Sequence, residues 1–430
     1  MGHAIRFRAP VSGHDPYASL RVRNYRWFIA SVLTMTLSAQ IQGVVVAWQI
    51  YDITRDPLSL GLMGLAEAGP FIAFALYAGH VADRANRHHV TLAAISAMVL
   101  CSASLLTFNL IPGFLHAHGA LPFYAVIFVS GIARSFAQPA RQALGAELVE
   151  RRLYANAVAW RSSTWQFAAV VGPAIGGLIY GFASPRVAYI ADAAMMLVSF
   201  AAFATIDYHH RERPVERRET IGESLGSGVR FVFGESVLLS ALTLDLFSVL
   251  LGGAEALLPV FADQILHVGP QGLGVLRAAP AAGAVVASIY LAHRPPFKRA
   301  GRTLLYAVGA FALCIVGFGL SRNFTISIAL LAISGVADNV SVLIRSTLLQ
   351  VLTPTALFGR VSSVNSIFVG SSNEIGAFES GVMARLIGTV PSVVLGGFAS
   401  LAVVITVGAI VPRLRRLGRI DELTPQQTAA

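Results

Sequence analysis

The chain has 430 residues, of which 55% are hydrophobic and 13% are charged, and this charged fraction is about half that of a typical soluble domain. The composition excludes a water-soluble globular protein. Apolar runs recur along the whole chain, and several reach the ~20 residues that cross a bilayer as a helix, which predicts a multi-pass membrane protein. The net charge of +10 does not indicate a nucleic-acid partner, because arginine also gathers in loops that face anionic lipid.

Residues 1–26 hold five arginines but no short apolar core before a small-residue cleavage site, so we expect a retained cytoplasmic tail and not a signal peptide. Twelve apolar segments follow, at approximately residues 27–51, 60–79, 90–112, 121–140, 157–180, 187–206, 236–262, 271–292, 302–320, 325–349, 361–386 and 391–412. A long charged stretch at 207–235 separates six segments from six. We therefore predict an all-α membrane protein with an N-terminal tail (1–26), a six-helix bundle (27–206), a cytoplasmic linker (207–235), a second six-helix bundle (236–412) and a cytoplasmic C-terminal tail (413–430).

Basic residues are distributed unevenly between the links. When both termini are placed in the cytoplasm, the outside links hold only Arg55, Arg186 and Arg322 as basic residues, and the inside links and tails hold many more. Because Lys and Arg accumulate in cytoplasmic loops, we expect a protein of the cytoplasmic (inner) membrane with both termini in the cytoplasm.

The two sets of six segments resemble each other. Residues 64–70 (GLAEAGP) match residues 274–280 (GVLRAAP) at an offset of 210, and residues 130–134 (SGIAR) match residues 334–338 (SGVAD) at an offset of 204. A duplication of six spans with equal topology implies two pseudo-symmetric bundles related by an axis along the membrane normal, with a cavity between them.

The charged residues inside the predicted spans include Glu67, Arg134, Asp192, Asp245, Glu255, Arg277, Asp338, Arg345, Glu374, Glu379 and Arg385. A charge at a helix centre that faced lipid would cost about 2.5–3.5 kcal/mol, so we expect these side chains to face a cavity, form pairs or bind protons. At two matched positions the charge changes sign between the halves, because Glu67 matches Arg277 and Arg134 matches Asp338. These inversions suggest that symmetric sites became complementary.

The candidates for proton or substrate binding are Asp338, Arg134, Glu374, Glu67, Arg277, Gln40 and Gln42. Asp338 and Arg134 are expected near mid-membrane, where each has either a functional role or a place in a static buried ion pair. Glu374 and Glu379 lie about 140° apart around a helix, so only one can point squarely into the cavity, and Glu374 is the better candidate. Gln40 and Gln42 are expected to face the cavity, because buried amides need partners.

An outward gate is also predicted. Glu67 lies near the outer end of the second segment and Arg385 near the outer end of the eleventh. We expect a Glu67–Arg385 ion pair to close the outer side of the cavity.

The link between the second and third segments contains Gly79, Asp83, Arg84 and Arg87 in the pattern G-x-x-x-D-R-x-x-R. A loop that supplied only positive charge would not require the glycine and the aspartate. The pattern resembles the signature loop of the major facilitator superfamily and departs from it at Asn86 and His88. The resemblance implies a conformational latch, in which glycine allows close helix approach and the charges form pairs that favour one state of the cavity.

The fifth segment contains Gly172, Pro173, Gly176 and Gly177 in the pattern G-P-x-x-G-G. Small residues let helix backbones touch and proline removes a backbone donor, which any tightly packed helix could use. The pattern resembles the helix motif of the drug:proton antiporters of the superfamily. Residues 44–65, 135–149 and 371–381 are similar to the exporter branch that contains the enterobactin and macrolide efflux proteins.

The resemblance implies a secondary transporter that exports small amphipathic compounds, drug-like or siderophore-like, by proton antiport with alternating access. Uptake of a small metabolite by symport is the alternative, and a membrane-embedded enzyme or scaffold is a third reading. The sequence holds no pattern typical of a catalytic nucleophile, a metal site or a phosphate loop, so we expect no enzyme activity, no metal and no cofactor. The expected partners are a small-molecule substrate, protons and membrane lipid, and the expected state is a monomer.

Overall fold

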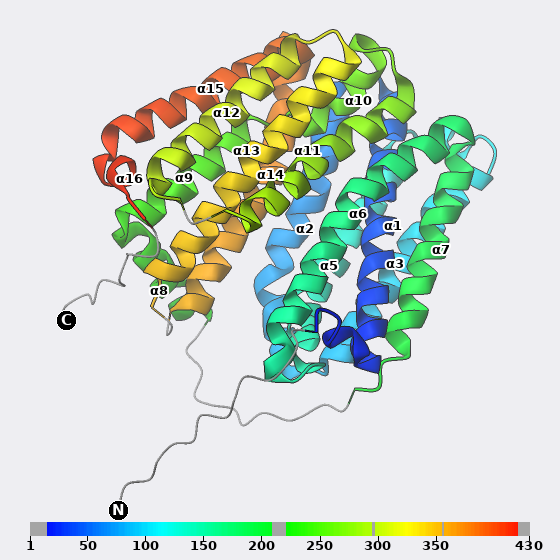
Figure 1. Ribbon diagram of the computed structural model, residues 1–430. Helices are drawn as coiled ribbons and strands as arrows, with labels where there is room; N and C mark the ends of the chain where they lie inside the picture. The colour runs from blue at the N-terminus through cyan, green and yellow to red at the C-terminus, as the bar shows by residue number, and fades with distance from the viewer. Residues whose placement is uncertain (1–14, 209–220, 295–296, 355–356, 420–430) are drawn as a thin grey trace, which may run out of the picture.

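The computed structural model describes residues 15–208, 221–294, 297–354 and 357–419 (Figure 1). Within these ranges, the side chains at 75–76, 80, 82–84, 221–225, 363, 367 and 371 are not described. The described residues form helices and connecting turns and contain no strand. This confirms the predicted all-α class.

The first bundle contains six long helices, which are α1 (Arg23–Thr54), α2 (Pro57–Arg84), α3 (Arg87–Leu110), α5 (Leu121–Glu147), α6 (Tyr154–Phe182) and α7 (Pro185–Ala204). The second bundle contains α9 (Ser236–Leu251), α11 (Gly269–Ala292), α12 (Ala300–Leu320), α13 (Phe324–Leu352), α14 (Phe358–Ile387) and α15 (Thr389–Ile410). The seventh span is broken, since α9 continues through η3 (Ala254–Leu257), α10 (Leu258–Val260) and the π-helical η4 (Phe261–Ile265). Shorter elements are η1 (Ser19–Arg21), α4 (Phe114–His118), η2 (Arg151–Leu153), α8 (Ile221–Gly234) and α16 (Pro412–Arg416).

Eleven helices in the described part of the chain are long and apolar enough to cross a membrane. The twelfth long helix, α14, spans 30 residues. The helices also extend beyond the predicted segments. α1 begins at Arg23, α8 lies in the stretch predicted as a linker, and α16 lies at the start of the predicted C-terminal tail.

Capping side chains set several helix starts. The Asp56 carboxylate accepts a hydrogen bond from the Leu58 amide at 3.0 Å before α2, and Asn86 accepts from the amides of His88 and His89 before α3. Such caps satisfy backbone donors that have no partner within the helix. The short links therefore hold successive helices antiparallel.

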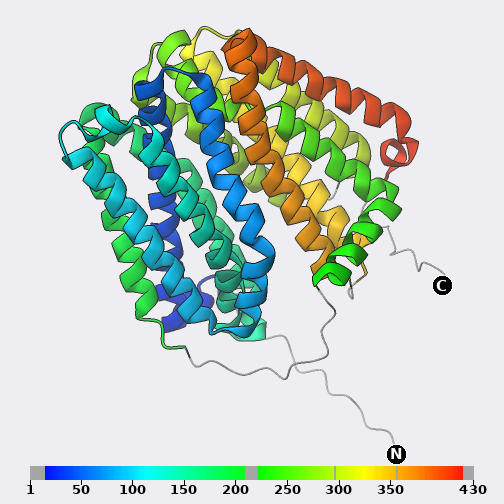
Figure 2. The same ribbon diagram turned by 180° about the vertical axis from the view of Figure 1, so that it is seen from behind.

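The two bundles touch at one end of the molecule and separate at the other (Figures 1 and 2). We call the end with links 54–57, 110–121, 182–185, 265–269, 320–324 and 387–389 the closed end, and the opposite end, with link 84–87 and α8, the linker end. Contacts between the bundles run mainly through α2 against α14 and α6 against α11. The structure is therefore closed at one end and splayed at the other.

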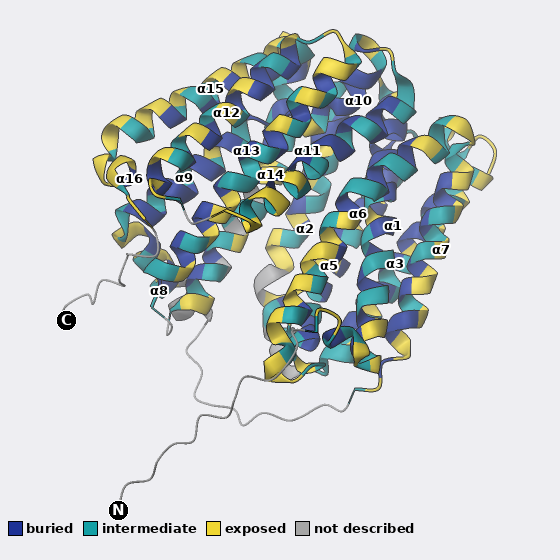
Figure 3. Cartoon of the chain, in the orientation of Figure 1, coloured by how far each residue is buried: buried dark blue, intermediate teal, exposed yellow. Residues whose placement is uncertain are grey.

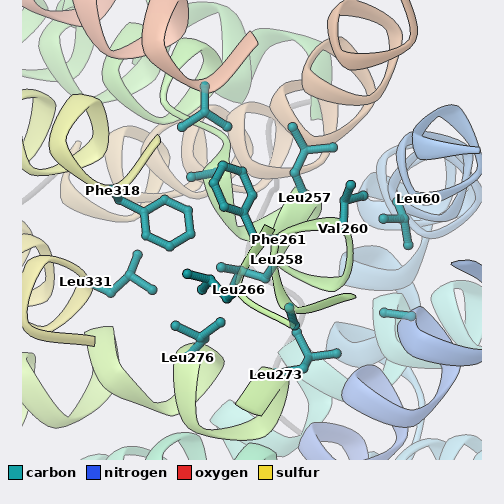
Figure 4. Close-up of a cluster of buried hydrophobic side chains, with 14 of the residues drawn as sticks. Leu60, Leu257, Leu258, Val260, Phe261, Leu266, Leu273, Leu276, Phe318 and Leu331 are labelled. Atoms are coloured by element: carbon teal, nitrogen blue, oxygen red, sulfur yellow. The ribbon is translucent and has the colours of Figure 1, made fainter. Parts of the chain in front are cut away.

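Buried apolar side chains fill the closed end. Phe261 stacks obliquely against Phe318 with ring centroids 4.5 Å apart, and Leu60 of the first bundle joins the same cluster beside Leu257 and Val260 of the second (Figure 4). Burying apolar surface stabilises such contacts by roughly 25 cal/mol per Å² in water. Exposed residues lie on the outer faces of the bundles (Figure 3), where many large apolar side chains are available to lipid.

Candidate functional site

Glu67 and Arg134 form an ion pair inside the first bundle. Glu67 lies on α2 and Arg134 on α5. The two helices approach closely because Gly131 has no side chain: a β-carbon there would lie 2.8 Å from the carbonyl oxygen of Glu67. Both residues are among the predicted candidates, but their pairing with each other was not predicted.

A cavity of about 70 Å³ adjoins this ion pair. Its polar wall is formed by Gln42, Glu67, Ser130 and Arg134, and apolar side chains from α1, α2, α3, α5 and α7 complete it. At ~15–30 Å³ per molecule, the space admits a few water molecules. The cavity thus leaves room for water beside Glu67 and Arg134 within the bundle.

Arg277 connects the second bundle to the first. Its Nη1 donates a hydrogen bond to the Gly43 carbonyl oxygen on α1 at 3.1 Å. A β-carbon on Gly43 would lie in ordinary contact with this side chain, 3.4 Å from Nη2 of Arg277. The predicted candidate Arg277 is therefore a contact between the bundles.

Glu374 lies between two arginines that belong to different bundles. Its carboxylate interacts electrostatically with Arg134 of α5 and with Arg277 of α11. The carboxylate oxygen Oε2 also lies 3.5 Å from the position of a β-carbon on Gly64 of α2. The structure thus brings together four of the predicted candidates, namely Glu67, Arg134, Glu374 and Arg277.

Glu255 adds a third carboxylate to this group. It lies on η3, at the break in the seventh span, and interacts with Arg277. The group of Glu67, Arg134, Glu255, Arg277 and Glu374, which we call the central charge cluster, holds three acids and two arginines. It has one carboxylate in excess when all five groups are ionised.

Asp338 belongs to a second group of charges. Arg345 and Asp245 form an ion pair in which 9% and 7% of the side-chain surfaces remain exposed. Asp338 interacts electrostatically with both, and also with Glu255 of the central charge cluster. The matched residues of the first bundle are Arg141 and Met35, and Arg141 Nη1 lies 3.4 Å from the Met35 sulfur. The duplication therefore retained the arginine and changed its partner.

The predicted outward gate requires a correction. Arg385 pairs with Asp56 at 3.4 Å and Glu67 pairs with Arg134, so a Glu67–Arg385 pair is not formed. The reason is position, because Arg385 lies at the closed end, level with the start of α2. Arg55 and Asp263 form a second ion pair between the bundles at 2.6 Å.

The glycine motif of α6 lies between α1 and α11. A β-carbon on Gly172 would lie 2.6 Å from that of Gln40, and one on Gly176 would lie 3.0 Å from Cα of Ile41. Gly177 faces the other bundle, where a β-carbon would lie 2.7 Å from Cα of Gly274. Pro173 is buried within the helix and its carbonyl oxygen also faces Gly274.

Gln40 and Gln42 do not face the same space. Gln42 lines the cavity beside Glu67, whereas the β-carbon of Gln40 packs against Gly172 of α6. Gln40 and Gln42 are two positions apart, so their side chains leave the helix in directions that differ by about 200°. They therefore cannot point into one cavity. The prediction for Gln40 is corrected accordingly.

The 84–87 link lies at the linker end. Among the described atoms, none would lie within 4 Å of a β-carbon on Gly79, so the part of the chain that the structure describes shows no close approach at this glycine. Arg87 pairs with Glu147 of α5 at 2.5 Å, within the first bundle. The side chains of Asp83 and Arg84 lie outside the described residues.

Three residues that the site prediction omitted also contribute. Asp56 pairs with Arg385, Glu255 joins the central charge cluster, and Asp192 is a fully buried carboxylate on α7. Glu255 and Asp192 carried a visible signal, since both are charges within apolar spans. Asp56 lies between spans and carried none.

A family model described as transmembrane secretion effector matches residues 14–427. The chain belongs to this family of the major facilitator superfamily. The superfamily member is similar to the enterobactin exporter EntS of Escherichia coli strain SMS-3-5 and to that of Shigella boydii serotype 18. Each is 25% identical to it over 403 residues, which cover 94% of both chains.

Solved transporters share the fold. A bacterial homologue of the human lysosomal transporter Spinster, in an inward-facing and occupied conformation, matches with a TM-score of 0.68 and 15% identity, covering 94% of this chain and 99% of the other. A peptide transporter of the POT type in complex with sulfate matches with a TM-score of 0.69 and 12% identity, covering 95% and 100%. This superfamily member is therefore a multi-pass membrane transporter with the twelve-helix fold, and it is not an enzyme.

Proposed function

We propose that this protein exports small amphipathic compounds, of drug or siderophore type, from the cytoplasm in exchange for protons. The observation that carries the proposal is the position of Glu374, whose carboxylate interacts with an arginine from each bundle. A change in its charge alters the attraction between the bundles at mid-molecule. The similarity to an enterobactin exporter over 94% of the chain supports export and a siderophore-like substrate.

The proposed orientation places the linker end and both termini in the cytoplasm of an inner-membrane protein. The uneven distribution of arginine supports it. In this orientation the described conformation is open inward and closed outward. Glycine contacts between helices and the two ion pairs at the closed end hold that state.

The proposed proton site is the excess carboxylate of the central charge cluster. One added proton balances the cluster, and a balanced cluster crosses the occluded state at a lower electrostatic cost. Glu374 is the preferred carrier, and Glu67 and Asp338 are the other candidates. A substrate that enters from the linker end competes with the proton for the Glu374 carboxylate, which couples release of one to binding of the other.

The 79–87 segment is proposed as a latch that acts in the outward-open state, in which the linker end is closed. The lack of a described atom within 4 Å of a β-carbon on Gly79 supports this, because it leaves the glycine available for a helix contact when the linker end closes. Arg87 and Glu147 would then anchor the latch to α5 through their ion pair.

Everted membrane vesicles test the direction and the driving force. With the vesicle interior made acidic, the proposal predicts accumulation of a catecholate siderophore or a lipophilic dye in vesicles that carry the wild type, and little or none with Glu374→Gln. Glu379→Gln is the matched control, because it makes the same change five residues along α14 on a different face. Accumulation only in right-side-out vesicles would show uptake, and no accumulation in either type would overturn transport of these compounds.

A further inference from the structure

Asp192 is a carboxylate inside the first bundle whose hydrogen-bond partners are neutral. It lies on α7 and is fully buried. Ser38 of α1 donates a hydrogen bond to its Oδ1 at 2.5 Å, and the Gln42 amide donates to its Oδ2 at 3.4 Å. Among the described residues, no ion pair reaches Asp192. A buried carboxylate normally has a cationic partner or carries a proton.

The second bundle shows that helix packing does not require an acid here. Ser38 corresponds to Ser248 of α9 at the offset of 210, and the helix that packs on α9 there is α15, which carries Ser400. The Ser400 hydroxyl donates to the Ser248 carbonyl oxygen at 3.4 Å, and both residues are buried. A neutral serine therefore makes the corresponding contact, and the carboxylate of Asp192 calls for another explanation.

Both partners of Asp192 can serve an ionised or a protonated acid. A serine hydroxyl donates or accepts, and a glutamine side chain offers an NH₂ donor or, after rotation, a carbonyl acceptor. Ser38 and Gln42 can thus donate to a carboxylate, and Gln42 can accept from a carboxylic acid. Lys or Arg at these positions would have fixed the charged form.

Asp192 also has a route to water. Gln42 forms part of the wall of the cavity of about 70 Å³ that adjoins Glu67 and Arg134. The titratable groups that face Asp192 are Cys101 of α3 and Tyr189 on its own helix. From α1, the helix most extensively packed against α7, the groups that face it are the neutral Ser38 and Gln42. A proton is thus the cation that fits this site.

We propose that Asp192 is a second proton-binding site, which exchanges its proton with the Glu67 carboxylate through water in the adjoining cavity, whose wall includes Gln42. The proton adds to Oδ2 of Asp192 on binding and returns from the same atom to water on release. A role for Asp192 in the transport cycle rests on the proposed exchange of substrate for protons. Proton binding at Asp192 does not rest on it, because binding can be measured without transport.

Infrared spectroscopy of the purified protein tests the proposal through the C=O stretch of a protonated carboxylic acid, which shifts in D₂O. A component of this band should be present in the wild type, rise as the pH falls, and be lost in Asp192→Asn. Ser199→Ala is the matched control, because the Ser31–Ser199 hydrogen bond lies at the same α1–α7 interface. This control should retain the band.

The variant Asp192→Ser addresses folding. It copies the serine pair of the second bundle, so it should unfold at nearly the wild-type temperature while losing the band. Retention of the full band in Asp192→Asn and Asp192→Ser would overturn the proposal. Removal of the band by sodium at constant ionic strength would also overturn it, in favour of a metal-cation site. Failure of pH-driven transport in a wild type that keeps the band would instead overturn the proposed function alone.

Discussion

The backbone of Gly177 on α6 lies directly against that of Gly274 on α11, where a β-carbon on Gly177 would be 2.7 Å from Cα of Gly274. The equivalent pair of helices in the other half also has a glycine contact, in which a β-carbon on Gly381 of α14 would be 2.9 Å from Cα of Gly61 of α2. Both contacts join the bundles near the closed end. Backbone contact of this kind requires that neither partner carry a side chain, so the closed end depends on these glycines.

Substitution of Gly177 should therefore open the closed end. A side chain in Gly177→Val overlaps the backbone of α11, and the bundles must separate there to admit it. Spin labels at Ala117 and Leu320, in closed-end links of the two bundles, should report a longer distance than in the wild type. Gly69→Val is the control, because a β-carbon at Gly69 has no atom within 4 Å. An unchanged distance in Gly177→Val, or an equal increase in the control, would contradict this role.

The Asp56–Arg385 ion pair should contribute little to the free energy of unfolding. Asp56 should contribute more to it as the cap of α2. Arg385 keeps 58% and Asp56 34% of the side-chain surface exposed, and such pairs are worth about 0–1 kcal/mol. Asp56→Asn removes the charge but keeps a capping oxygen for the Leu58 amide. Asp56→Ala also removes the cap, at a further cost of about 1 kcal/mol.

The free energy of unfolding in detergent separates these two effects. Asp56→Asn and Arg385→Gln should each lower it by less than about 1 kcal/mol, and Asp56→Ala should lower it more. Equal losses for Asp56→Asn and Asp56→Ala would show that capping contributes nothing measurable.

Arg345 should be far more important for stability than its counterpart Arg141. Arg345→Met leaves the buried Asp245 without its partner, which costs about 3–5 kcal/mol in such pairs. Arg141→Met removes a contact to the sulfur of Met35, and a hydrogen bond contributes a net ~0.5–1.5 kcal/mol. Denaturant unfolding of the two variants measures the difference. Similar losses of stability would contradict the assignment of the Asp245–Arg345 pair as structural.

The fold was predictable because its signals are long and periodic. Segment length and polar interruptions located all twelve spans, and the two offsets revealed the duplication, since related bundles keep residues at matched places such as Gly177 and Gly381. The break of the seventh span was not predicted. Gly252 and Gly253 mark it in the sequence, but two glycines in an apolar run also occur in continuous helices.

The site was predictable as a set of residues and not as a set of contacts. A charged residue in an apolar span can be recognised from the sequence, because a charge that faced lipid would be energetically costly. The candidates Glu67, Arg134, Arg277 and Glu374 were selected for this reason. Its partner depends on the rotation and depth of each helix, and a shift of one residue turns a side chain by about 100°. For this reason, Glu67 was assigned to Arg385 when its partner is Arg134.

Transport should require the guanidinium group of Arg277 and not only a positive charge at this position. The planar fork lets one side chain bind the Gly43 carbonyl and face Glu374 together, which a lysine ammonium cannot reproduce. Hydrogen bonds to charged groups contribute about 1.5–3 kcal/mol, so Arg277→Lys should reduce transport by about ten-fold or more. Arg322→Lys is the control, because Arg322 bonds carbonyl oxygens of its own turn. Wild-type transport in Arg277→Lys would exclude this bridging role.

Proton antiport is tested most directly in liposomes that contain the purified protein, a trapped pH indicator and a fluorescent substrate. The account predicts that substrate movement in one direction drives proton movement in the other, and that Glu374→Gln abolishes both while Glu379→Gln leaves both intact. Movement of substrate and protons in the same direction, or substrate movement with no change in internal pH, would contradict it.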